Sequence, residues 1–127
     1  MTPESALRCA RTGTYGIVVS NHGGRIMQDT LPPISVLSEI KEAVGDQMKI
    51  LVDGGIRSGS DVFKCLALGA DAVLIGRPYA IAAHGGGAEG VALYTDKILQ
   101  ELKETMLMTD CRTLADITQE KVRRYPA

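Results

Sequence analysis

The sequence has little with which to recognise nucleic acids or membranes. It contains no tryptophan, one phenylalanine and four tyrosines, so few aromatic rings are available to stack on bases. Its formal net charge is -1 without a block of basic residues, which argues against a polyphosphate partner. No apolar run approaches the roughly 18 residues that a membrane-spanning helix needs. We therefore expect neither a nucleic-acid partner nor a membrane span.

Cysteine and histidine are also scarce. Cys9, Cys65 and Cys111 are odd in number and far apart, with no CxxC pair and no histidine at the spacing of metal ligands. We expect reduced thiols and no metal site. The first residues lack the charged and then apolar regions of a secretory signal peptide, so the expected location is cytoplasmic.

Three short apolar runs rich in β-branched residues alternate with amphipathic helical patterns. The strands are expected in "YGIVVS" (15–20), "MKILVDGG" (48–55) and "DAVLIGRP" (71–78). The helices are expected over 2–13, 34–44 and 58–69. Ser58 and Asp61 open the last of these at the spacing of a helix cap. This alternation predicts right-handed βαβ units and a parallel sheet whose strands are buried on both faces.

The last third of the chain has a different pattern. "AAHGGGAEG" (82–90) predicts a glycine-rich interruption, with His84 as a surface loop residue. One long amphipathic helix should follow over 91–108. A short helix over 113–122 should open at Thr113, with Asp116 three residues further on.

Each predicted strand ends in a polar turn that contains glycine. These turns are "SNHGGR" (20–25), "DGGIRSG" (53–59) and "GRP" (76–78). In a parallel sheet or barrel the carboxyl ends of the strands lie on one face, where ligands bind. We therefore expect the three turns to converge on one site.

The second and third turns are suited to an anion. Gly54 and Gly55 allow close backbone approach and leave N–H groups free to face a phosphate. Arg57 and Arg77 can add charge-assisted hydrogen bonds. The alternative is that the glycines only permit tight turns and the arginines are solvated.

The first turn suits a small organic acid. His22 and Arg25 are three residues apart in a glycine-rich loop, where both side chains can face one ligand. Histidine takes a proton near neutral pH, and arginine holds a carboxylate with two parallel hydrogen bonds. The alternative is a loop histidine without a role.

The order of "GIVVSNHGGR", "ILVDGGIRSGSDVFKCLALGADAVLIGRP" and "GGGAEGV" resembles the C-terminal part of the FMN-dependent α-hydroxy-acid oxidizing enzymes. That family includes glycolate oxidase, lactate oxidase and flavin-type lactate dehydrogenases. The resemblance implies the C-terminal portion of a TIM (β/α)8 barrel, with about three parallel strands and their helices. Residues 1–127 would then be a single partial domain.

The resemblance also implies roles for individual residues. His22 matches the active-site base, Arg25 the arginine that holds the substrate carboxylate, and Ser20 a serine that contacts the flavin ring. The residues that match the turns holding the FMN ribityl phosphate are Asp53, Gly54, Gly55, Arg57, Gly76 and Arg77. The implied reaction is FMN-dependent oxidation of a small 2-hydroxy acid to a 2-oxo acid.

A full barrel typically takes about 250 residues, roughly twice the length of this chain. We therefore expect the isolated chain to be weakly active or inactive, and to self-associate or need a complementing N-terminal half, because three strands leave sheet edges open. One alternative is a catalytically silent half-barrel that binds phosphate or FMN. Another, a barrel of the inosine monophosphate dehydrogenase type, is disfavoured because it leaves His22 and Arg25 unexplained.

Overall fold

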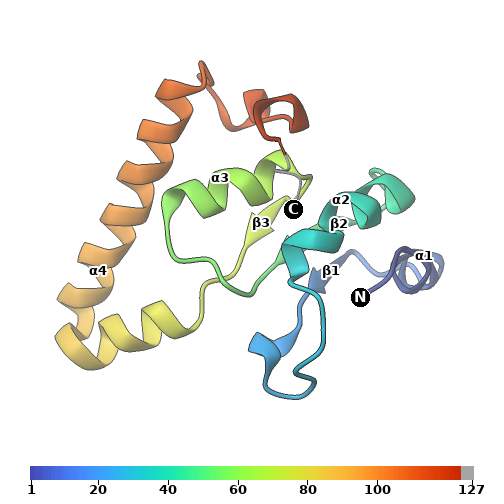
Figure 1. The fold of residues 1–127 in the computed structure, drawn as a ribbon, viewed down its shortest axis with the longest axis horizontal. Coiled ribbons are helices and arrows are strands. Elements are labelled where there is room, and N and C mark those ends of the chain that lie inside the picture. Colours follow the sequence, from blue (N-terminus) through green and yellow to red (C-terminus); the bar gives the residue numbers. More distant parts are fainter. Residues whose placement is uncertain (124–127) are drawn as a thin grey trace.

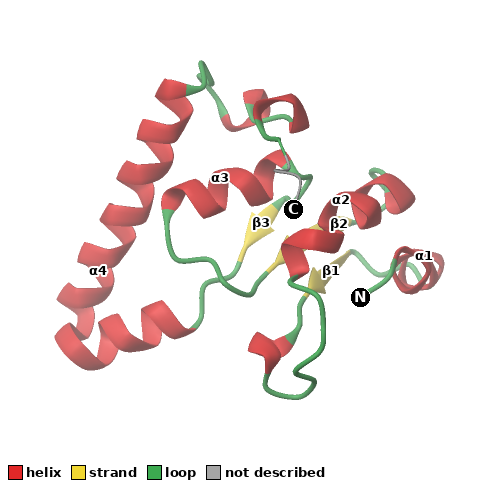
Figure 2. Cartoon of the chain, in the orientation of Figure 1, coloured by secondary structure: helices red, strands yellow, loops and turns green. Residues whose placement is uncertain are grey.

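The computed structural model describes residues 1–123, and the last four residues of the predicted 1–127 unit lie outside the described residues. Three parallel strands form one sheet, in the order β1-β2-β3 (Figure 1). The elements are α1 (Pro3–Arg11), β1 (Gly16–Val19), η1 (His22–Gly24), α2 (Pro33–Val44), β2 (Lys49–Val52), α3 (Gly59–Ala67), β3 (Ala72–Val73), α4 (Arg77–Met108), η2 (Leu114–Asp116) and η3 (Gln119–Lys121). The predicted alternation of strands and helices is confirmed (Figure 2).

Side-chain caps begin two of the helices where the sequence predicts them. The Thr2 hydroxyl accepts a hydrogen bond from the Ser5 N–H at 3.2 Å, and α1 ends two residues before Gly13, whose φ is +76°. The Ser58 hydroxyl likewise accepts from the Asp61 N–H at 3.2 Å. These caps satisfy N–H groups that a helix cannot pair internally, so they fix where α1 and α3 start.

The register of the sheet brings the ends of the strands together. β1 pairs with β2 from Gly16–Lys49 to Val19–Val52, and β3 continues the sheet beside Val52. β3 has two residues, shorter than the predicted run over 71–78, because the chain turns away after a last ladder bond from the Leu74 N–H to the Val52 carbonyl. All three turns therefore leave the sheet at one edge.

The two faces of the sheet differ in burial. Val19, Ile50 and Val52 share one face and belong to one buried core with Leu37 of α2. Val18 points to the opposite face and is 50% exposed. The prediction of strands buried on both faces was therefore wrong for β1, because the core of the described chain covers only the face that carries Val19.

Helix α4 contains the glycine-rich segment instead of following it. It runs over Arg77–Met108 and bends at Gly87, whose φ of 55° and ψ of -141° are not helical. A Cβ atom at Gly90 would lie 2.4 Å from the Ala82 carbonyl oxygen, so the two arms of the helix touch at the bend. The predicted interruption over 82–90 is therefore a kink within a helix.

Two smaller sequence predictions also differ from the structure. His84 is exposed as expected but lies in α4, with Nδ1 2.8 Å from the carbonyl oxygen of Ala80, and not in a loop. The segment over 113–122 forms the short turns η2 and η3, not one helix. The predicted cap is present, since Thr113 and Asp116 form a reciprocal capping box.

Across residues 1–123, every helix is too short or too polar to span a lipid bilayer. The same residues contain no cluster of three or more His, Cys, Asp or Glu side chains that could hold a metal ion. All three cysteines are free, and burial raises the pKa of the Cys65 thiol to about 11. Cys65 is therefore a core side chain, not a reactive thiol.

Candidate functional site

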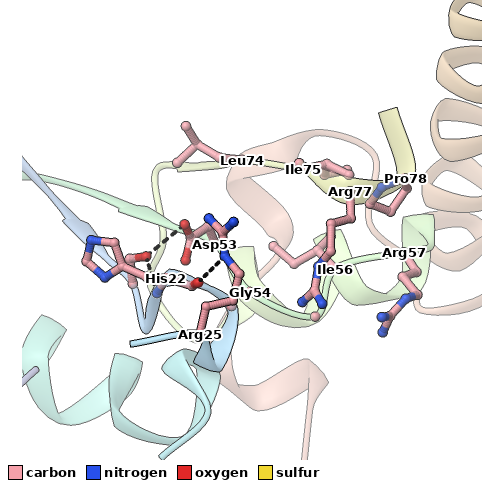
Figure 3. Close-up of a pocket in the computed structure, with 14 residues that line it drawn as sticks. His22, Arg25, Asp53, Gly54, Ile56, Arg57, Leu74, Ile75, Arg77 and Pro78 are labelled. Carbon is pink, nitrogen blue, oxygen red and sulfur yellow. Dashed lines mark hydrogen bonds between the residues drawn. The ribbon is translucent and has the colours of Figure 1, made fainter. Parts of the chain in front are cut away.

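A pocket of about 500 Å³ lies at the carboxyl edge of the sheet, where the three turns meet (Figure 3). Every residue that the sequence predicted for the site lines it: Ser20, His22, Arg25, Asp53, Gly54, Gly55, Arg57, Gly76 and Arg77. The lining residues that the sequence did not single out are Gly23, Ile56, Leu74, Ile75 and Pro78. The three turns therefore converge on one cavity.

The first turn is held in a sharp conformation by its own side chains. The Ser20 hydroxyl accepts a hydrogen bond from the His22 N–H at 3.0 Å, and the Asn21 side chain accepts from the Gly23 N–H at 3.0 Å. His22 has φ +54°, a left-handed conformation that non-glycine residues rarely adopt. Arg25 donates from Nε to the backbone carbonyl of His22 at 3.4 Å, which links the two residues within the turn.

The second turn presents a half-buried carboxylate and two glycines. Asp53 accepts from the Ser20 hydroxyl through Oδ2, while its Oδ1 is buried without a hydrogen-bond partner among residues 1–123. Gly54 has φ +86°, and a Cβ there would lie 3.2 Å from both the Asn21 side chain and Pro33. Gly54 is therefore required by its conformation and by the close approach of the first turn.

The third turn brings a second cation to the pocket. The Arg77 guanidinium lies against the first turn, 3.3 Å from where a Cβ of Gly23 would stand. Arg77 and the preceding Gly76 begin α4, so their N–H groups are among those a helix leaves unpaired. In the described part of the chain, the N–H groups of Gly54, Gly55, Gly76 and Arg77 donate no hydrogen bond.

The pocket carries more positive than negative charge. Arg25, Arg57 and Arg77 line it together with the single carboxylate of Asp53. Within residues 1–123 none of these arginines takes part in an ion pair. Unpaired cations beside free N–H donors favour an anionic ligand.

Asn21 is a site-forming residue that the sequence prediction missed. Its side chain fixes Gly23 of the first turn and also lies against Gly54 of the second. Asparagine often accepts a hydrogen bond from the N–H two residues further on, which is the signal that could have revealed it. Its contact with Gly54 depends on the packing of two strands and has no signal in the local sequence.

Parallel βα units whose turns meet in one cationic, glycine-rich pocket are typical of β/α barrels, which often bind a phosphate group at this end. The family model described as FMN-dependent dehydrogenase matches residues 1–124. The chain belongs to this family.

Individual relatives agree with that membership. The chain is 45% identical over 123 residues to a peroxisomal (S)-2-hydroxyacid oxidase of Arabidopsis thaliana, covering 97% of the chain and 34% of the relative. It is 46% identical over 121 residues to an L-lactate oxidase of Roseobacter sp. (strain GAI101), and that match covers 94% of this chain and 32% of the relative. A crystal structure of mandelate oxidase with benzoyl-formic acid superposes with a TM-score of 0.90 at 43% identity, over 92% of this chain and 35% of that one. The chain thus spans about a third of the length of the curated relatives it matches.

Proposed function

We propose that this chain holds FMN at its second and third turns and supplies, from its first turn, the base and the carboxylate clamp for oxidation of a small 2-hydroxy acid. One observation carries the proposal. His22 and Arg25 line the same pocket as Gly55, Arg57 and Arg77, with His22 and Arg57 at its two ends (Figure 3). A flavin nucleotide is long, with its ring at one end and its phosphate at the other, which matches this separation.

The residues present fit the ribityl phosphate of FMN. Within residues 1–123, Oδ1 of Asp53 is buried without a hydrogen-bond partner, and a ribityl hydroxyl would supply the missing donor. The free N–H groups of Gly55 and Gly76 and the guanidinium groups of Arg57 and Arg77 suit a phosphate. Ser20, at the end of the pocket where His22 lies, would lie beside the flavin ring.

Arg25 and His22 then have separate roles, in substrate binding and in proton transfer. FMN, when bound, would accept the two electrons and the second proton that leave the substrate. The guanidinium of Arg25 binds the substrate carboxylate with two parallel hydrogen bonds, which orients the carbon that carries the hydroxyl. An imidazole nitrogen of His22 takes one of the two protons released on oxidation to the 2-oxo acid. The hydrogen bond between Arg25 and the His22 carbonyl keeps clamp and base adjacent.

A second candidate function is favoured by the open side of the sheet. Val18 is 50% and Leu74 41% exposed on or beside the strands, and the described chain has three strands, whereas a full barrel has eight. On this account the chain alone binds FMN or phosphate without turnover. It self-associates through the exposed strands or requires a complementing N-terminal half for activity.

Activity is tested by co-expressing the chain with the N-terminal two thirds of the related L-lactate oxidase and loading the complex with FMN. Anaerobic mixing with L-lactate, glycolate or mandelate should bleach the oxidised flavin absorbance. His22→Ala should leave FMN bound and abolish the bleaching. With His84→Ala, the matched histidine control outside the pocket, the flavin should bleach as it does with the unsubstituted chain.

Bleaching of the flavin that persists in His22→Ala would refute the assignment of His22 as the base. A complex that binds FMN and never bleaches would favour the second candidate.

A further inference from the structure

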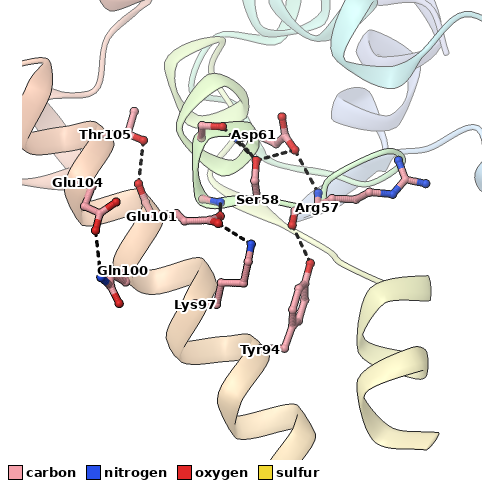
Figure 4. A network of polar contacts seen from close by, with 11 residues as sticks. Arg57, Ser58, Asp61, Tyr94, Lys97, Gln100, Glu101, Glu104 and Thr105 are labelled. Carbon is pink, nitrogen blue, oxygen red and sulfur yellow. Dashed lines mark hydrogen bonds and ion pairs between the residues drawn. The ribbon is translucent and has the colours of Figure 1, made fainter. Parts of the chain in front are cut away.

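One face of α4, which carries Tyr94 and Glu101, contacts the second turn (Figure 4). The Tyr94 hydroxyl donates a 2.9 Å hydrogen bond to the backbone carbonyl of Arg57, which is 37 residues away in the sequence. Arg57 is one of the residues that line the pocket. The bond therefore restrains the backbone of Arg57, whose side chain we propose to bind the phosphate.

The same face of α4 holds the start of α3. Glu101, two helical turns after Tyr94, accepts a hydrogen bond from the Gly59 N–H at 2.8 Å, and Lys97 pairs with the Glu101 carboxylate. A Cβ at Gly59 would stand 2.2 Å from the backbone nitrogen of Leu102, so α4 lies directly on this residue. The turn and the helix are in direct backbone contact.

Carboxylates already occupy N–H groups at the start of α3. The Gly59 N–H is bound by Glu101, and the Arg57 N–H donates to Asp61 at 3.2 Å. A phosphate is therefore held by the groups that remain, which include the Arg57 side chain and the N–H of Gly55. The Arg57 side chain extends from the residue whose carbonyl Tyr94 holds.

Tyr94 also packs on the residue that follows the third turn, within the first arm of α4. Its ring packs edge to face on Tyr79, with ring centres 5.0 Å apart and planes at 85°. Tyr79 follows Arg77 and Pro78 by two and one positions, and its hydroxyl lies 3.0 Å from that of Thr95. Partial burial raises the pKa of the Tyr94 phenol, so it remains a donor at and above neutral pH.

We propose that Tyr94 is a positioning residue for the phosphate site, which couples the turn of Arg57 to the turn of Arg77 and so sets the spacing of the two cations. Its hydroxyl holds the turn of Arg57, and its ring packs on Tyr79, which directly follows the other turn. This inference rests on the proposed function, because it assigns the two turns to the phosphate of FMN. It adds a residue of α4 that lies outside the pocket.

The test compares Tyr94→Phe, which keeps the ring and removes the hydroxyl, with the unsubstituted chain. Tyr15→Phe is the matched control, because Tyr15 is 83% exposed and precedes β1 at the opposite edge of the sheet. The affinities for FMN and riboflavin are measured by flavin fluorescence, and hydrogen exchange is followed over residues 54–60. Riboflavin lacks the phosphate, so the ratio of the two affinities reports on the phosphate contacts alone.

Tyr94→Phe should weaken FMN binding by about two- to tenfold, the effect of one lost hydrogen bond, leave riboflavin binding unchanged and speed exchange over 54–60. Tyr15→Phe should change none of these. An unchanged ratio in Tyr94→Phe, or a parallel loss of both flavins, would overturn the inference. If the unsubstituted chain does not prefer FMN, the proposed function fails separately. Exchange over 54–60 then decides whether Tyr94 positions the turn.

Discussion

The hydroxyl of Ser20, directly after β1, donates a 2.8 Å hydrogen bond to Oδ2 of Asp53, directly after β2. It also accepts from the His22 N–H, so one hydroxyl joins the first turn to the second. The other carboxylate oxygen of Asp53 is buried and has no hydrogen-bond partner among residues 1–123. Ser20 and Asp53, which line the pocket, are thus also the residues that hold its first and second turns together.

Replacing Ser20 by Ala should destabilise the chain by about 1–3 kcal/mol, because the half-buried Asp53 carboxylate loses its hydrogen-bond donor. The change in the free energy of unfolding is measured by urea denaturation. Ser38→Ala, on α2 and away from the pocket, should stay within about 0.5 kcal/mol of the unsubstituted chain. Equal stability of the two variants would mean that the bond between Ser20 and Asp53 contributes nothing.

Two glycines should respond to alanine in opposite directions. At Gly59 a Cβ would lie 2.2 Å from the Leu102 backbone nitrogen, so Gly59→Ala should cost about 1–3 kcal/mol or more. At Gly86, a helical position in α4, a Cβ meets nothing within 4 Å. Gly86→Ala should therefore stabilise by about 0.5–1 kcal/mol. Thermal unfolding of both variants checks the prediction, and a stable Gly59→Ala chain would contradict the contact between α3 and α4.

The contribution of the α3 cap to the free energy of unfolding should depend on pH. Partial burial raises the pKa of Asp61, but hydrogen bonds from Ser58 and the Arg57 N–H, with the nearby charge of Lys64, outweigh it and hold the pKa below its ordinary value. Because the folded pKa is the lower one, this contribution is present above about pH 4 and is lost as the pH falls through the folded value. Asp61→Asn should show a smaller loss of stability between about pH 5 and pH 2, measured by urea unfolding at each pH. An identical pH profile would refute the role of Asp61.

Local sequence signals predicted most of the site because each turn carries its own chemistry. The caps at Thr2 and Ser58 and the left-handed glycines of "DGGIRSG" depend on residues close in sequence. Parallel pairing then places the ends of the strands at one edge, so the pocket follows from the topology. The residues that would hold the ligand are therefore readable from the sequence.

Features that depend on tertiary packing could not be predicted in the same way. The exposure of Val18 follows from which face of the sheet the core covers. The glycines of α4 look like a loop in sequence, yet only Gly87 leaves the helical conformation. The bond from Tyr94 to Arg57 joins residues that no short pattern connects.

We propose that the second and third turns hold the phosphate of FMN. Titration of the chain with FMN, and with riboflavin as control, is followed by flavin fluorescence. FMN should bind at least about tenfold more tightly than riboflavin, because charge-assisted hydrogen bonds from Arg57 and Arg77 contribute only to FMN. Arg57→Gln together with Arg77→Gln should remove this preference. Equal affinity for the two flavins in a folded, unsubstituted chain would contradict the account.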